Sequence, residues 1–242
     1  MSERMQKTMA EAMDCPRRDR TESEGEVGVQ TYMEIVGGEL VEKHFIGECL
    51  MEQITDIHNL SRAYRRVVGN GGSGGVDGMN VRELLPWLQS EVEALRQSLL
   101  AGTYVPQPVR RVEIPKDNGK KRLLGIPTVT DRVVQQAICQ ILGCIYEPTF
   151  SRTSYGFRPH RGAHQALLEA RRNVTEGYKY AVGIDLERFF DTVNQSKLID
   201  ILSRKVKDGR VVSLIHKYLR SGVMVHGELQ ATVEGTPQGG PL

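Results

Sequence analysis

The chain has few aromatic residues, few cysteines and no long apolar run, and each shortage excludes a class of protein. Aromatic side chains make up 6% of the 242 residues, with a single tryptophan, Trp87. The four cysteines form no CxxC pair and lack histidines at matching spacing, which argues against a zinc site and a disulfide framework. Because no run of eighteen apolar residues exists, we expect no membrane span. The first twenty residues lack the apolar core of a signal peptide, so we expect a cytoplasmic protein.

The small net charge of +2 conceals an uneven distribution. Acidic residues outnumber basic ones in the first fifty residues, whereas the stretch from Tyr104 to Arg172 contains twelve Lys or Arg against five Asp or Glu. Such a basic block is typical of a surface that meets a polyanion, and nucleic acid is the commonest one. A solvated charged face is the alternative, and composition alone slightly favours it.

Composition and periodicity divide the chain into four parts. Residues 1–46 predict a mobile acidic leader, because they are poor in apolar residues. Residues 47–103 predict helices interrupted by GNGGSGGVDG, whose glycines indicate a flexible loop or hinge. Residues 104–177 predict a hairpin followed by helices, and residues 178–242 begin with a short apolar strand.

The individual elements follow from helical or alternating periodicity and from turn residues. Asn80 is expected to cap a helix that Pro86 could split, and Asp131 is expected to open another. Asp117-Asn118-Gly119 and His226-Gly227 are hairpin turns. The predicted helices cover 47–68, 80–102, 131–148, 163–176, 196–206 and 209–220, and the predicted strands cover 109–115, 121–127 and the two arms of 223–233.

The run YAVGIDL at 180–186 predicts a buried central strand that ends in a carboxylate, Asp185. A rigid strand end is a common position for a metal ligand, and a carboxylate suits Mg²⁺, which prefers hard oxygen ligands. The alternative is a structural aspartate that caps the next turn. The strand taken by itself favours this alternative.

Several further sequence motifs favour the metal-ligand interpretation of Asp185 over the structural one. GIDLERFFDTV contains Asp185, and GSGGVDGM (72–79), IPKDNGKKRLLGIPTVTDRVVQQAI (114–138), SYGFRPHRGAHQAL (154–167) and EGTPQGGPL (234–242) accompany it. In this order they resemble the N-terminal loop, fingers and palm motifs of group II intron-encoded reverse transcriptases, also called maturases. The resemblance covers roughly residues 47–242.

The resemblance implies an α+β fold, with the fingers and a partial palm of a right-hand polymerase. It also implies an RNA-directed DNA polymerase that adds dNTPs to a DNA primer 3′-hydroxyl on an RNA template by two-metal nucleotidyl transfer with Mg²⁺. Group II intron RNA would be a further partner, with assistance to splicing. The sequence contains no aromatic-x-Asp-Asp turn. We therefore expect the chain to be truncated before the catalytic hairpin and the thumb, and to be inactive alone.

Family roles transfer to single positions. Asp185 corresponds to the first of three catalytic, metal-binding aspartates. Lys116 and Arg122 match a pair that binds the triphosphate. The Lys ammonium group offers phosphate oxygens a compact positive charge, and the Arg guanidinium can donate two parallel hydrogen bonds to them. Phe190 matches the steric gate against a ribose 2′-hydroxyl, and Gln238 matches a glutamine beside the incoming nucleotide.

The remaining assignments are less specific. Arg158 is a candidate for contact with template RNA, with an ion pair that locks its loop as the equal alternative. Arg110 and Arg111 are candidates for contact with the RNA backbone. Phe189 is expected to be a core residue, and the Leu186 carbonyl is a candidate metal ligand.

Three alternatives to the intron enzyme stay open. One is a retron, diversity-generating or CRISPR-linked reverse transcriptase, which the N-terminal loop motif and the long fingers disfavour. Another is a non-catalytic RNA-binding fingers module, because a basic surface binds RNA without any metal. The third is the product of a truncated pseudogene. The oligomeric state and the identity of the RNA do not follow from the sequence.

Overall fold

A computed structural model of the chain describes residues 30–36, 39–45, 49–115, 119 and 121–241. The chain divides into two compact units, residues 1–49 and 50–242. In the first unit, β1 (Gln30–Val36) pairs antiparallel with β2 (Glu39–Phe45) in a register that sets Gln30 opposite Phe45. The prediction of a mobile leader over 1–46 missed this hairpin. Residues 1–29 lie outside the described part.

The second unit contains seven α-helices and two short 3₁₀ turns among its described residues. Most begin close to where the sequence predicts, because a side-chain cap fixes the first turn. Asp56, Thr128, Asn194 and Asp208 each accept a hydrogen bond from a backbone N–H in the turn that follows. The elements are α2 (Leu50–Ile54), α3 (Ile57–Asn70), α4 (Leu84–Leu100), α5 (Val129–Tyr146), η1 (Glu147–Thr149), α6 (Ala163–Thr175), η2 (Phe189–Asp191), α7 (Gln195–Lys205) and α8 (Gly209–Arg220).

Three helix boundaries differ from their predictions. The single helix predicted over 47–68 is divided into α2 and α3, and the cap of α5 is Thr128, whereas Asp131 was expected to open this helix. Asn80 does not cap α4; its side chain accepts from the Arg82 backbone N–H at 2.9 Å, in the turn before the helix. Pro86 lies in the first turn of α4 and leaves the helix unbroken, because the N–H that proline lacks has no helical partner there. No helix among the described residues is both long and apolar enough to cross a membrane.

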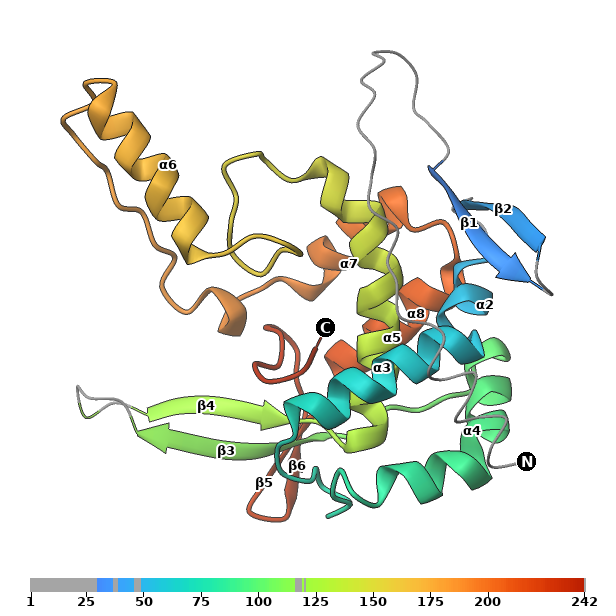
Figure 1. Ribbon diagram of the computed structural model, residues 1–242. Coiled ribbons are helices and arrows are strands. Elements are labelled where there is room, and N and C mark those ends of the chain that lie inside the picture. The colour runs from blue at the N-terminus through green and yellow to red at the C-terminus, as the bar shows by residue number, and fades with distance from the viewer. Residues whose placement is uncertain (1–29, 37–38, 46–48, 116–118, 120, 242) are drawn as a thin grey trace. The chain divides into compact units, whose positions relative to one another are not determined.

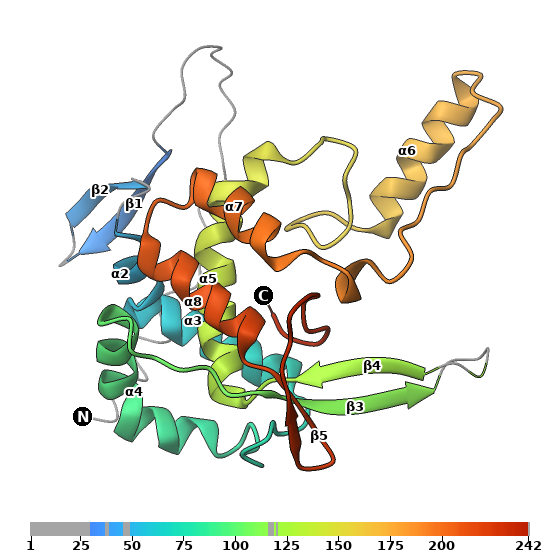
Figure 2. The same ribbon diagram turned by 180° about the vertical axis from the view of Figure 1, so that it is seen from behind.

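The sheet of the second unit combines two hairpins that are distant in sequence (Figures 1 and 2). β3 (Val109–Pro115) pairs antiparallel with β4 (Lys121–Ile126), and β5 (Val223–Val225) pairs with β6 (Glu228–Gln230). Both hairpins were predicted. A short parallel pairing of Val109 with Val223 joins them in the order β4-β3-β5-β6, and this pairing was not predicted.

The core of the second unit surrounds α5. α3 crosses α5 on one side and α8 passes on the other, as the two opposite views show (Figures 1 and 2). Every residue from Val129 to Ile138 is buried. A helix buried on all faces must satisfy its polar side chains internally, and α5 carries several of them.

Asp131 is the most heavily bonded of these buried polar side chains. Its carboxylate accepts hydrogen bonds from Thr128 Oγ1 (2.7 Å), Tyr104 Oη (2.8 Å), Tyr218 Oη (3.1 Å) and the Gln107 N–H (3.2 Å). Burial raises the pKa of Asp131, and the four donors oppose that shift. The carboxylate therefore joins the start of α5, the segment before β3, and α8.

The predicted buried strand at 180–186 is wrong. These residues form no strand, and Val182 and Ile184 are each 87% exposed. No hydrogen bond joins residues 179–187 to any other described residue. Tyr180, Val182, Ile184 and Leu186 occupy alternate positions, so the pattern of a strand is present. A buried strand requires neighbouring strands, and the described residues provide none here.

Replacing Asp131 with Asn should lower the free energy of unfolding by about 2–4 kcal/mol, because an amide cannot accept all four donors and brings its own N–H groups against them. Urea denaturation of the 242-residue chain measures this. Asp200→Asn, at an exposed carboxylate paired only with Arg204, is the matched control and should change little. Equal urea midpoints for the two variants would contradict the assigned role of Asp131.

Candidate functional site

The segment Gly235–Gln238, from the last predicted motif, is hydrogen-bonded to the segment that carries Phe190. The Thr236 N–H donates to the Phe190 carbonyl at 2.7 Å, and the Gly235 N–H donates to the Val193 carbonyl at 2.8 Å. A Cβ on Gly235 would lie 2.8 Å from the Asp191 carbonyl oxygen. The close backbone approach and the positive φ of 76° both explain glycine at this position.

The same segment also contacts the fingers hairpin. The Gly125 N–H in β4 donates to the Gln238 carbonyl at 2.8 Å. A Cβ on Gly239 would lie 2.7 Å from the Gly125 carbonyl oxygen, and one on Gly240 would lie 2.4 Å from Gln135 Oε1. The two glycines thus allow a close approach of other parts of the protein.

These contacts border a polar groove of about 210 Å³. Its walls come from β3 and β4, from residues at both ends of η2, from the end of α8 and the start of β5, and from the Gly235–Gln238 segment. Two of the predicted site residues, Arg111 and Gln238, lie in this groove. Its charged and polar lining residues include Arg111, Arg188, Asp191, Glu234, Thr236 and Gln238.

Asp185 does not line this groove. It lies on the unpaired segment described above and is exposed. Phe189 and Phe190 form an edge-to-face pair with ring centroids 5.4 Å apart, and they are 50% and 52% exposed. The prediction that Phe189 is a core residue is therefore wrong, and Phe190 has a free face.

A metal site would need several oxygen ligands around Asp185. Among the described residues, no three His, Cys, Asp or Glu side chains gather where they could hold a metal ion. Asp191, another acid of the motif, faces Arg188 at 3.5 Å between Oδ2 and Nε. The described residues thus supply a single predicted carboxylate ligand, Asp185, and do not fit a two-metal centre by themselves.

The fingers hairpin exists as predicted, but the contacts of its two predicted phosphate-binding residues are not described. Lys116 lies outside the described residues. The backbone of Arg122 pairs with Ile114 across β3 and β4, while its side chain lies outside the described part. The roles of both residues stay predictions.

The glycine-rich segment is held by two arginines, contrary to the prediction of a flexible loop. Arg110 donates from Nε (3.1 Å) and Nη2 (2.8 Å) to the Gly74 carbonyl. Arg132 donates from Nη1 to the Gly71 carbonyl (3.1 Å) and from Nη2 to the Ser73 carbonyl (2.6 Å). Sequence reasoning missed Arg132, because its partners are backbone carbonyls about sixty residues away.

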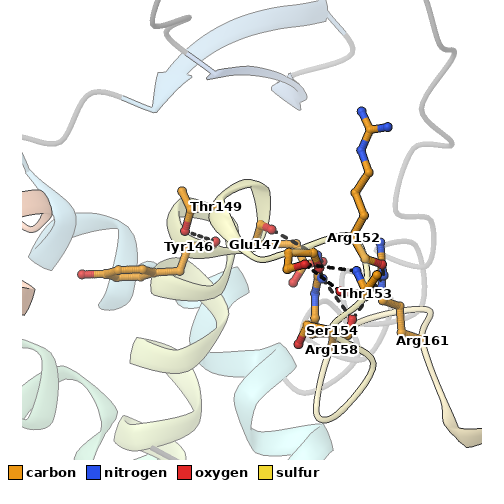
Figure 3. Close-up of polar contacts among 9 residues, drawn as sticks. Tyr146, Glu147, Thr149, Arg152, Thr153, Ser154, Arg158 and Arg161 are labelled. Atoms are coloured by element: carbon orange, nitrogen blue, oxygen red, sulfur yellow. Dashed lines mark hydrogen bonds and ion pairs between the residues drawn. The ribbon is translucent and has the colours of Figure 1, made fainter. Parts of the chain in front are cut away.

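Arg158 is anchored within its own loop (Figure 3). Its guanidinium donates to Glu147 Oε1 at 2.7 Å and to the carbonyls of Ser151 (2.6 Å) and Ser154 (3.1 Å). It also lies 5.3 Å from the centroid of the Phe150 ring, and its side chain is 7% exposed. The geometry favours the locking alternative for Arg158, because few of its donors remain available to RNA.

Comparison with known proteins gives the family. The model of the reverse transcriptase (RNA-dependent DNA polymerase) family matches residues 114–242, more than half of the chain. The chain belongs to this family.

Curated relatives refine the assignment. The chain is 43% identical over 155 residues to the group II intron-encoded protein LtrA of Lactococcus lactis subsp. cremoris, covering 64% of this chain and 26% of that protein. It is 39% identical over 199 residues to protein YkfC of Escherichia coli, covering 80% of this chain and 52% of that protein. The resemblance to group II intron reverse transcriptases and maturases is confirmed. The chain spans about half of YkfC and about a quarter of LtrA.

A solved structure supports the fold. A chain of a partial Cas6-RT-Cas1–Cas2 complex matches with a TM-score of 0.52 and 22% identity, over 84% of this chain and 37% of that chain. The predicted α+β class, with reverse-transcriptase fingers and part of the palm, is confirmed.

The close packing of Gly75, in the glycine-rich loop, can be tested by substitution. A Cβ on Gly75 would lie 2.6 Å from the Thr128 Cα and N atoms, whereas one on Gly69 would meet nothing within 4 Å. Gly75→Ala should lower the free energy of unfolding by about 1–3 kcal/mol, because backbone must move. Gly69→Ala, at the end of α3, should be neutral or stabilising by up to about 1 kcal/mol. Thermal melting of both variants checks this, and an unchanged melting temperature for Gly75→Ala would contradict the packing.

Proposed function

We propose that this chain supplies the fingers and the first part of the palm of an RNA-directed DNA polymerase of the group II intron type. One observation carries the proposal. The Gly235–Gln238 segment bonds to β4 of the fingers hairpin and to the Phe190 segment, so three separate blocks of the motif series meet at one groove. Motifs that matched by chance would have no reason to converge.

The proposed substrates are an RNA template, a DNA primer and dNTPs. We assign Gln238 and Phe190 to the nucleotide, and Lys116 and Arg122 to its triphosphate, as the family resemblance implies. Arg111 lies in the groove and is half-exposed, so it can meet a phosphate. Arg110 and Arg158 are assigned to positioning their loops, since their guanidinium groups already bond to carbonyls.

Asp185 is the proposed catalytic carboxylate and the proposed Mg²⁺ ligand. No group of three possible metal ligands forms around it among the described residues, so these residues do not make a complete metal site. We propose that the 242-residue chain alone does not polymerise DNA.

The proposed natural partner is group II intron RNA, on the precedent of the intron-encoded relatives, and the proposed location is the cytoplasm. A non-catalytic RNA-binding module is the second candidate. The exposed, unpaired segment around Asp185 favours it, because a polymerase requires that carboxylate on a rigid support.

Incubating the purified chain with an RNA template, a DNA primer, dNTPs and Mg²⁺ should give no extension above background. The chain should nevertheless bind RNA with an affinity that falls steeply with salt, since basic side chains release counterions on binding. Gel analysis and fluorescence anisotropy measure the two properties. Extension that Asp185→Asn abolishes would contradict the predicted inactivity, and absence of RNA binding would contradict the proposed function.

Addition of the remaining part of LtrA as a separate polypeptide separates the two candidate functions. Extension that appears only with both pieces and is lost in Asp185→Asn supports the polymerase. Unchanged inactivity, with RNA binding intact, supports the RNA-binding module.

A further inference from the structure

The loop between η1 and α6 is held in one shape by its own arginines. Arg158 bonds to Glu147 and to two loop carbonyls, as described above. Arg161 donates from Nη1 to the carbonyls of Arg152 and Ser154, and it lies 5.4 Å from the centroid of the Tyr155 ring. Figure 3 shows Arg158 and Arg161 beside the residues of this loop to which they donate. Such internal bonding can support a local conformation that would otherwise be unfavourable.

Phe157 has that unfavourable conformation. Its φ is +55°, in the left-handed region that a bulky L-residue rarely adopts. Its side chain is completely exposed to solvent. An exposed phenyl ring contributes no burial to folding, and the backbone strain opposes folding. Contacts among the described residues therefore explain neither the exposed phenyl ring nor the positive φ of Phe157.

The surroundings of Phe157 indicate the chemistry of a ligand. Phe150 and Tyr155, the other rings of the loop, each already have an arginine guanidinium over one face, whereas no described cation covers Phe157. The Arg152 side chain is exposed and extends away from the loop (Figure 3). No described residue bonds to its guanidinium. The loop thus presents a free aromatic face and a free cation at nearby positions in the chain.

We propose that Phe157 is a stacking platform for an unpaired nucleobase of single-stranded RNA, and that Arg152 contacts a phosphate of the same strand. Unstacked bases are recognised by aromatic faces combined with arginine, and this mode tolerates any base sequence. A paired duplex would not use the ring, because its bases are stacked on each other. The proposal rests on the proposed function only in that the chain binds RNA.

A pocket on a partner protein is the competing explanation for an exposed phenylalanine. The other exposed polar and cationic residues of the same loop, including Arg152 and His160, favour nucleic acid over an apolar protein pocket. The two explanations differ in their response to leucine, which retains size and apolar character but has no ring.

The test is fluorescence anisotropy of a labelled single-stranded RNA of mixed sequence, titrated with the 242-residue chain at several salt concentrations. Phe157→Ala and Phe157→Leu should each weaken binding about tenfold, within the range of one lost base stack, and leave the slope of log affinity against log salt unchanged. Phe157→Trp should bind at least as tightly as the wild type. Arg152→Gln should reduce that slope by about 0.7, the value for one phosphate contact on a single strand.

The controls separate stacking from a structural role. All variants should keep the wild-type melting temperature, and Phe157→Ala should bind blunt duplex RNA as the wild type does. Wild-type affinity in Phe157→Ala, or in Phe157→Leu, would overturn the stacking proposal and leave the proposed function standing. Failure of the wild type itself to bind single-stranded RNA would overturn both.

Discussion

The second unit depends on one buried carboxylate, that of Asp131. The carboxylate accepts a hydrogen bond from Thr128 at the first turn of α5, and it accepts two more from the hydroxyl groups of Tyr104 and Tyr218. The junction between β4 and α5 is thereby held in place, and both glycine motifs close against it: Gly75 packs on Thr128, and Gly240 approaches Pro127 and Gln135. A buried acid thus sets the surface on which two functional motifs assemble.

Parts of the second unit differ in how firmly hydrogen bonds hold them. The fingers hairpin, the glycine-rich loop and the Gly235–Gln238 segment are all bonded to the frame around α5. The segment from 179 to 186 forms no regular structure and is exposed, with its apolar side chains at alternate positions. An apolar strand of this kind is stable only between neighbouring strands. The groove proposed for the nucleotide is therefore built, whereas the described residues give no rigid support to Asp185, the proposed catalytic carboxylate.

Sequence reasoning succeeded where the determinants are local. The two hairpin turns and the helical spacing of apolar residues are local signals, and both hairpins and most helices lie close to their predicted positions. It failed where the partner is remote. The strand at 180–186 requires neighbours that no local pattern can supply. The arginines at 110 and 132 bond to backbone carbonyls of the glycine-rich loop, which carry no sequence signal.

Hydrogen exchange of the intact chain, followed by mass spectrometry, tests the central claim that a well-bonded fingers region coexists with an unpaired segment around Asp185. The amides of 133–142 in α5 should be the most protected, because they open only with global unfolding. The amides of 179–187 should exchange at the rate of an unstructured peptide. Protection of 179–187 comparable to that of α5 would show that the Asp185 strand is paired after all, and would contradict the claim.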